Sequence, residues 1–526
     1  MIMRRIFRTV ALASLTALVI ALGGCDITSL NDNSNQPSRA DTPKLLTNAE
    51  VDIANQYWQD YAGGFWVRYA QYWTTNQYTD ADRYNFKSSR PSALNDLFED
   101  YYLALNNLQE IIRANQDPSS QTRSFGPPEN QIAIAKIMQA WTLKTMTDMF
   151  GPIPLSEALD GRSTLQGNDE AFTPTYDSQE EIYTAILDSL TTASQQIDPG
   201  TPALASGDKI YGGDMSKWKK FANSLKMRVA ITLADQKPGV AETAIEEAVS
   251  AGVFESNDDS ALFPFSTSPP HQNPFYENNV VSGRDDWAAP ESILGPMNET
   301  NDPRRPAFFS DAKPDESGNQ FIGFPYGLNE GEAQSLFVSG SFSRPSARVA
   351  ATPDAPCIFM LHDEVLFIKA EARLRDDLDV SGAISESGQA LYEQAIEASM
   401  RHWDASQSDI DDYFAQDGVP TPVTSSNFRQ VLGTQKWIAQ YLQGVPGWTT
   451  FRRMDFEGVL SPPAGDPGEE KFGRSFAVRM KYPNQEFSLN EENVTAAINN
   501  FLGGSGASAD NQGALLYWDT SPPPNP

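Results

Sequence analysis

QIAIAKIMQAWTLKTMTDMF, residues 131–150, is the strongest helical pattern in the chain. Its apolar side chains recur three and four positions apart, which is the spacing that brings side chains onto one face of an α-helix. More than one face is apolar, so we expect this helix to be buried. Gly151 and Pro152 follow it directly, and this pair is typical of a helix end. The stretch therefore predicts an α-helical core.

Outward from this helix, the same periodicity predicts most of the remaining elements. Ser178 and Glu181 have the spacing of a capping box, which predicts a helix start at Ser178. A short strand is expected at residues 476–481. The further predicted helices are 45–59, 95–114, 178–196, 216–234, 238–251, 361–376, 388–405, 426–443 and 491–502.

Two helix pairs suggest how these elements stack. The helices at 216–234 and 238–251 form one pair, and those at 361–376 and 388–405 form the other. Each pair spans roughly the 34 residues of a tetratricopeptide unit, whose helix pairs stack into a superhelix. We therefore predict a mostly α fold, with tetratricopeptide-like helix pairs forming a superhelical scaffold, large loop-rich insertions and few short strands.

One insertion, at about residues 258–356, lacks a long helical pattern. It contains FPFSTSPPHQNPFYENN, GRDDW and FIGFPYGLNEGE, which are rich in Pro, Gly and Asn but also in aromatic residues. Long stretches without secondary structure are uncommon in compact domains and are usually functional or disordered. The aromatic content favours an ordered, functional segment.

The N-terminus has the layout of a secretory signal peptide. Arg4, Arg5 and Arg8 precede an uncharged run at residues 9–24, which is short for spanning a hydrocarbon core of roughly 30 Å. The run ends in LGGC, which looks like a bacterial lipobox, where the cysteine receives a diacylglycerol. We predict a lipoprotein signal peptide at 1–24, lipidation at Cys25, a flexible tether at 25–43 and a single domain at 44–526. The alternatives are an ordinary signal peptide with a chance cysteine, and an uncleaved anchor.

Charge and composition exclude several classes of protein. The chain has 69 acidic and 39 basic residues, a net charge of −30, so we expect no binding to nucleic acid. An aromatic content of 11% excludes a disordered acidic chain. Such an acidic surface keeps proteins soluble when salt screens repulsion, which suggests a high-salt source.

The sequence contains no pattern for a catalytic, metal or cofactor site. It has two cysteines, Cys25 and Cys357, and three histidines that are far apart, which does not fit a disulfide framework or a metal-ligand spacing. Phosphate-binding and nucleophile-elbow motifs are absent. Asp409, Asp411 and Asp412 could hold Ca²⁺ weakly, but surface charge is the favoured interpretation. We predict no catalytic residues, no metal and no cofactor.

Several stretches, in order along the chain, resemble the SusD/RagB family of surface lipoproteins, in its second, SusD-like branch. They include QAWTLKTMTDMFGPIPLSEAL, LHDEVLFIKAEARLR, QKWIAQYLQGVPGWTTFRRM and the terminal LLYWD. The resemblance implies a non-enzymatic lipoprotein of the outer membrane, facing the cell exterior. Such a protein captures an oligosaccharide or a peptide and delivers it to a SusC-like TonB-dependent β-barrel transporter. The alternatives are a surface-anchored glycan or peptide hydrolase and a purely structural subunit of such an assembly.

Two stretches combine aromatic residues with amides, carboxylates and arginine, the mixture that binds carbohydrate. One is residues 65–86, and the other is residues 271–287. In the first, Trp66, Tyr69 and Trp73 have helical spacing, which favours a core role; in the second, loop packing is the alternative. The candidate ligand-binding residues are Trp66, Tyr78, Asn273, Tyr276, Asn278, Arg284 and Trp287.

The paired arginines after Trp448 have a structural explanation. We expect Arg452 and Arg453 to pair with buried carboxylates or to contact helix C-termini. Glu371 and Arg375 have the spacing of an ordinary i,i+4 helix pair. These residues are therefore predicted to support the fold and not to bind ligand.

Overall fold

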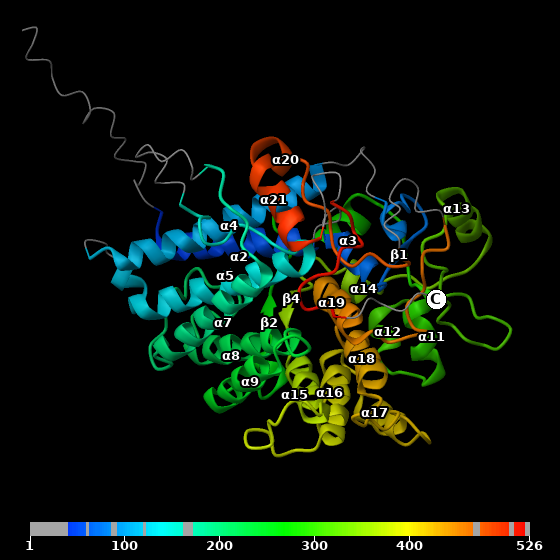
Figure 1. Cartoon of the computed structure of the whole chain (residues 1–526). Helices are drawn as coiled ribbons and strands as arrows, with labels where there is room; N and C mark the ends of the chain where they lie inside the picture. The colour runs from blue at the N-terminus through cyan, green and yellow to red at the C-terminus, as the bar shows by residue number, and fades with distance from the viewer. Residues whose placement is uncertain are drawn as a thin grey trace, which may run out of the picture. The chain divides into compact units, whose positions relative to one another are not determined.

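The chain is described by a computed structural model and is mostly helical (Figure 1). The described residues are 40–58, 63–85, 92–118, 122–160, 172–465, 474–503 and 510–520. The predicted signal peptide, Cys25 and most of the predicted tether lie outside these ranges. Among the described residues, no helix has the length and apolar content needed to cross a membrane.

Six helices form a stack in which each helix packs against the next member of the stack (Figure 1). Nearly all residues of α5 are buried, polar ones included, because α4 and α7 pack against it from two sides. Ser178 caps α7, and Glu181 completes the predicted capping box. The stack consists of α2 (Thr42–Trp58), α4 (Ser92–Gln116), α5 (Pro128–Phe150), α7 (Gln179–Gln196), α8 (Met215–Thr232) and α9 (Pro238–Ala251).

A second group of helices follows later in the chain and joins the stack through contacts of α15 with α8 and of α19 with α5. The pairs α8–α9 and α15–α16 pack closely, as the tetratricopeptide-like pattern predicted. The mostly α fold class is therefore confirmed. The group consists of α15 (His362–Leu374), α16 (Gly388–His402), α17 (Gln407–Phe414), α18 (Phe428–Ala439) and α19 (Gly444–Met454), with α3 (Gly63–Tyr69) packed on α19 and with α20 (Glu486–Leu489) and α21 (Glu491–Phe501) near the C-terminus.

The single helix predicted at 426–443 is wrong at its C-terminal end. The helix stops at Ala439, Leu442 has a positive φ of 68°, and a new helix begins at Gly444. A Cβ atom at Gly444 would lie 2.4 Å from the carbonyl carbon of Trp66, so this close approach requires glycine. The turn therefore exists to fit α19 against α3, a contact that local sequence patterns do not reveal.

The strand predicted at residues 476–481 is not formed. Its backbone amides bond to two separate segments: Val478 N donates to the Gln512 carbonyl at 2.8 Å, and Met480 N donates to the Met149 carbonyl at 2.8 Å. The segment thus satisfies its polar backbone without a regular ladder.

The loop-rich insertion consists of short elements, of which the longest is α13 (Glu330–Ser339). Two antiparallel strand pairs tie it to the rest of the chain: β1 (Thr74–Thr75) with β3 (Trp287–Ala288), and β2 (Ala261–Phe263) with β4 (Cys357–Met360). The insertion also contains η4 (Asn257–Asp259), α10 (Pro274–Tyr276), η5 (Glu277–Val281), α11 (Glu291–Glu299), α12 (Arg305–Phe308) and α14 (Ala347–Ala350). Two short elements precede it in the chain, η1 (Ala81–Arg83) and η2 (Thr122–Phe125).

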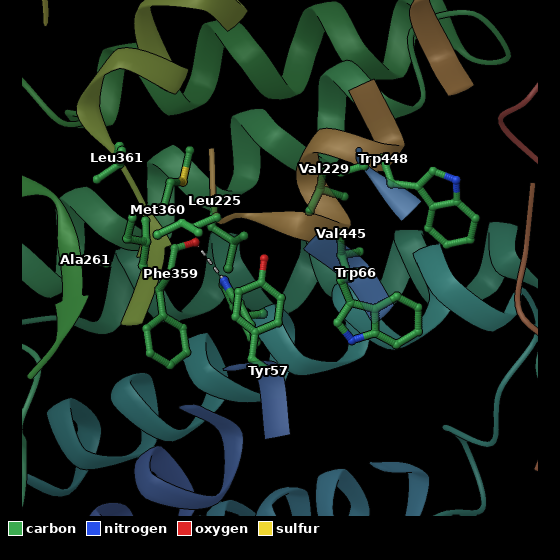
Figure 2. Close-up of a cluster of buried hydrophobic side chains, with 14 of the residues drawn as sticks. Tyr57, Trp66, Leu225, Val229, Ala261, Phe359, Met360, Leu361, Val445 and Trp448 are labelled. Carbon is green, nitrogen blue, oxygen red and sulfur yellow. Dashed lines mark hydrogen bonds between the residues drawn. The ribbon is translucent and has the colours of Figure 1, made fainter. Parts of the chain in front are cut away.

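Buried aromatic residues join both helix groups in one core (Figure 2). Trp66 stacks on Trp448 with ring centroids 6.3 Å apart. Trp141 packs edge-on against Phe359 and donates its indole N–H to the Phe359 carbonyl at 3.0 Å. Each such side chain contributes roughly 1.5–3 kcal/mol by leaving water, so these contacts hold the scaffold rigid behind the loop-rich side.

Candidate functional site

The two predicted ligand-binding stretches lie side by side, although about 200 residues separate them in the chain. Thr74 pairs with Ala288 and Thr75 with Trp287 across β1 and β3. Beyond the strand, the Asn76 backbone N–H donates to the Asp286 carbonyl at 2.9 Å. This pairing brings the residues that follow β1 next to those that precede β3.

Tyr78 is the exposed aromatic residue at this junction. It is 45% exposed and has a positive φ of 55°, which is uncommon for a tyrosine. The Arg284 guanidinium carbon lies 5.0 Å from the centroid of the Tyr78 ring, within the range of a cation–π contact. The backbone places the ring in solvent, and Arg284 restricts its orientation.

Further charged groups lie next to Tyr78 and Arg284. Arg284 Nε donates to Asp286 Oδ2 at 2.7 Å, and Glu330 Oε1 accepts from the Tyr78 backbone N–H at 3.4 Å. The neighbouring Asp285 pairs with Arg344, whose guanidinium carbon lies 4.4 Å from the Phe337 ring centroid. We call this set the Tyr78 surface, defined by Tyr78, Arg284, Asp285, Asp286, Glu330, Phe337 and Arg344.

The Tyr78 surface offers what a sugar requires. An aromatic face can cover the apolar face of a pyranose ring, and arginine and carboxylate groups can donate to and accept from its hydroxyl groups. Partial burial lowers the pKa of Arg344, yet it keeps an ion pair with Asp285. In the described part of the chain, no group of three or more His, Cys, Asp or Glu side chains is arranged to hold a metal ion.

Three of the predicted ligand-binding residues are buried and do not belong to the Tyr78 surface. Trp66 is 1% exposed and belongs to the core, in line with its helical spacing. Asn273 is fully buried, where its Oδ1 caps α10 and its Nδ2 donates to the Ala355 carbonyl at 2.7 Å. Trp287 is buried against Trp73. In this structure these three side chains have no open face for a ligand.

The other predicted residues differ in how far they are exposed. Tyr276 is half-buried, Asn278 is buried within η5, and Arg284 contributes directly to the Tyr78 surface. Sequence reasoning did not select Asp285, Glu330, Phe337 or Arg344. For Asp285 and Glu330, the sequence offers one signal: each is a charged residue in an aromatic-rich segment, GRDDW or GLNEGE. Such charges are ordinarily exposed to water and bind nothing, so this signal does not select them.

A concave surface lies between α4 and the α20–α21 segment. It has a volume of about 340 Å³ and includes three large, exposed apolar side chains: Leu103, Phe172 and Leu489. Its charged lining residues are Glu99 and Glu486, and no lysine or arginine is among the described residues that line it. We call this surface the α4 groove. It can bind an apolar group but lacks the arginine donors of the Tyr78 surface.

Residues 34–483 match the model of a protein family, SusD-like_2, which is described as "Starch-binding associating with outer membrane". No curated protein matches the chain.

Solved structures resemble the chain over most of its length. A SusD homologue from Bacteroides uniformis is 26% identical, with a TM-score of 0.71, and the match covers 91% of this chain and 99% of that one. A chitin-binding SusD homologue from Flavobacterium johnsoniae is 24% identical, with a TM-score of 0.71 and coverage of 91% and 98%. A SusD homologue from Bacteroides thetaiotaomicron is 22% identical, with a TM-score of 0.72 and coverage of 92% and 100%.

Proposed function

We propose that this chain, which belongs to the SusD-like family of starch-binding, outer-membrane-associated proteins, captures an oligosaccharide at the cell surface as a nutrient. The observation that carries the proposal is the exposed Tyr78 ring, with Arg284 on it and with Asp286 and Glu330 bonded to Arg284 and to the Tyr78 backbone. An oligosaccharide is favoured over a peptide because the family is described as starch-binding and one similar structure is that of a chitin-binding protein.

In the proposed complex, a sugar ring stacks on Tyr78. Arg284 and Arg344 donate to sugar hydroxyls, and the oxygens of Asp285 and Glu330 accept from them. Because the two arginines already lie over aromatic rings and pair with carboxylates, little side-chain freedom would be lost on binding.

The proposed anchor is a lipid on Cys25. The signal peptide at 1–24, the tether at 25–43 and the single domain at 44–526 complete this proposal, with the protein on the outer face of the outer membrane. Labelled palmitate should enter the wild-type protein and not the Cys25→Ala variant, and protease added to intact cells should degrade the wild type. A protein that remains protected from protease would contradict the outward orientation.

The proposed partner is a SusC-like TonB-dependent barrel that receives the oligosaccharide and imports it. Purification of the tagged chain from its native membrane should recover such a barrel. If the chain were a purely structural subunit, the barrel would still copurify with it, but the chain would bind no glycan.

Binding is tested by calorimetry with starch and chitin oligosaccharides of increasing length. Tyr78→Ala should weaken the affinity, while Phe172→Ala, which removes an exposed ring from the α4 groove, should not. If Phe172→Ala alone weakens binding, the site lies in the α4 groove. Shortened sugars after long incubation would support the alternative of a hydrolase, since the proposed protein binds and does not cleave.

A further inference from the structure

A small polar cavity lies within the scaffold, away from the Tyr78 surface. Its volume is about 20 Å³, which exceeds the roughly 10–15 Å³ needed to hold one water molecule. Residues of α5, α8, α15, α18 and α19 line it, so it lies where the two helix groups meet. A single small species in this cavity would contact both groups.

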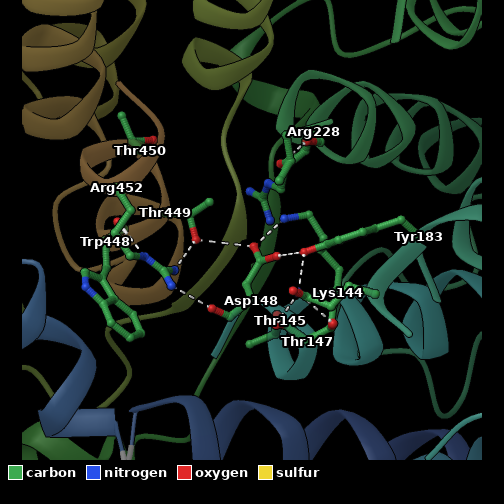
Figure 3. A network of polar contacts seen from close by, with 12 residues as sticks. Lys144, Thr145, Thr147, Asp148, Tyr183, Arg228, Trp448, Thr449, Thr450 and Arg452 are labelled. Atoms are coloured by element: carbon green, nitrogen blue, oxygen red, sulfur yellow. Dashed lines mark hydrogen bonds and ion pairs between the residues drawn. The ribbon is translucent and has the colours of Figure 1, made fainter. Parts of the chain in front are cut away.

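The carboxylates at the cavity already have hydrogen-bond donors, and Figure 3 shows those of Asp148. Asp148 accepts from Lys144, from Thr449 and from the Tyr183 hydroxyl. Both oxygens of Glu364 accept from Arg228. No carboxylate oxygen at the cavity is therefore left without a donor in the described part of the chain.

A third carboxylate, behind the cavity wall, is satisfied in the same way. Glu371 accepts from both terminal nitrogens of the wall residue Arg453, at 2.5 and 2.6 Å. Three of the cations that line the cavity therefore each form an ion pair: Lys144 with Asp148, Arg228 with Glu364, and Arg453 with Glu371.

Donors remain without acceptors. Lys436 lines the cavity and is 3% exposed, yet its ammonium group forms no hydrogen bond or ion pair with any described residue. Gln440 Nε2 and Arg228 Nη1 likewise donate to no described group. A buried ammonium group without an acceptor is costly. Burial lowers the pKa of Lys436 to about 8, so it still carries its charge at neutral pH.

The cations at the cavity outnumber the carboxylates by one. Lys436 is a fourth cation beside three balanced pairs, and Val445 and Pro446 from the first turn of α19 also line the wall. A helix N-terminus carries a partial positive charge, although Pro446 itself has no N–H to donate. A halide ion accepts hydrogen bonds and also neutralises the extra positive charge, which a neutral water molecule does not.

We propose that this cavity is a binding site for a monatomic halide, chloride under ordinary conditions, held by Lys436 with Gln440 and Arg228. The bound ion joins α8, α18 and the N-terminus of α19, and it stabilises the junction of the two helix groups as the chloride concentration rises. The site is independent of glycan binding.

The direct test uses crystals of the wild-type protein soaked in sodium bromide, with diffraction measured at the bromine absorption edge. We expect an anomalous peak within hydrogen-bonding distance of Lys436 Nζ. A cavity with no anomalous peak, or with density for water alone, would overturn the proposal.

A second test compares melting temperatures in sodium chloride and in sodium gluconate at equal ionic strength, because gluconate is too large for the cavity. Between 0.01 and 1 M salt, wild-type protein should gain roughly 2–4 °C more in chloride. Lys436→Met should lose this difference, while Lys209→Met, which removes an exposed lysine, should keep it. Identical curves for the two salts, or a chloride effect that persists in Lys436→Met, would count against the site.

Discussion

Arginine–carboxylate pairs occur both in the helical scaffold and on the Tyr78 surface, but they serve different purposes. In the scaffold, the Arg228 and Glu364 side chains are 8% and 1% exposed and bind each other through two hydrogen bonds. On the Tyr78 surface, the Arg284 and Asp286 side chains are 29% and 11% exposed. Burial makes the first pair structural, because neither partner can be replaced by water. Partial exposure leaves the second pair able to exchange water for a ligand.

The largest expected effect is on the buried pair. Arg228→Met leaves Glu364 charged, buried and without its main donor, so the free energy of unfolding should fall by about 3–5 kcal/mol. Urea denaturation followed by circular dichroism measures this change. Adding Glu364→Leu should restore part of the loss, since the unpaired charge is then removed. If Arg228→Met with Glu364→Leu is less stable than Arg228→Met alone, the loss in Arg228→Met does not come from an unpaired Glu364 charge.

On the Tyr78 surface, the effect should appear in binding and not in stability. Tyr78→Ala should raise the Kd for the preferred oligosaccharide about tenfold to a hundredfold, which corresponds to about 1.4–2.8 kcal/mol. Its unfolding curve should stay close to that of the wild type, because Tyr78 is 45% exposed and lies outside the buried core. A loss of stability with unchanged affinity would assign Tyr78 to the fold instead.

A pH titration should separate the scaffold from the surface further. Burial and the neighbouring Glu364 raise the pKa of Asp363 to about 7. The folded protein therefore keeps a proton that the unfolded chain releases near pH 4, and this group's contribution to stability is lost as the pH rises from about 4 to 7.

Asp363→Asn should remove that contribution to the pH dependence. Urea midpoints at pH 4.5, 5.5, 6.5 and 7.5 measure it, with Asp412→Asn on the exposed face of α17 as the control. Equal pH profiles for the wild type and Asp363→Asn would show that Asp363 is already ionised in the folded protein.

The smallest effect is expected at an exposed scaffold pair. Arg401 and Glu397 lie one turn apart on α16, with side chains 47% and 40% exposed. Arg401→Ala should change the free energy of unfolding by only about 0.3–0.5 kcal/mol, because water and salt screen the pair. A cost close to that of Arg228→Met would mean that exposure does not explain the contrast between the two regions.

Prediction from sequence succeeded where a short stretch carried the whole interaction. The helices at 131–150 and 238–251 followed from spacing alone, and the capping box at Ser178 followed from two residues three positions apart. The structural role of Arg453 was also expected, although its partner was not: it binds Glu371, 82 positions away. The helix predicted at 426–443 failed because the break after Ala439 depends on distant Trp66.

The candidate site was only half predictable for the same reason. Tyr78 and Arg284 were selected separately, each for its own residue type, and their contact depends on the pairing of β1 with β3. Trp66 was also selected, and the structure places it in the core. Residue type indicated an aromatic and charged surface, but exposure decided which residues form it.

The sequence alone determined the helices, the acidic surface and the resemblance to a nutrient-binding family, because residues within one or two turns of each other settle helix formation. The tertiary structure alone decided the charge pairs between distant parts of the chain. Arg228 meets Glu364 across 136 positions, whereas Lys436 lines the cavity without an ion pair to any described carboxylate. Which opposite charges meet in a core depends on how whole helices pack, and the free energy of each pair depends on the water that this packing excludes.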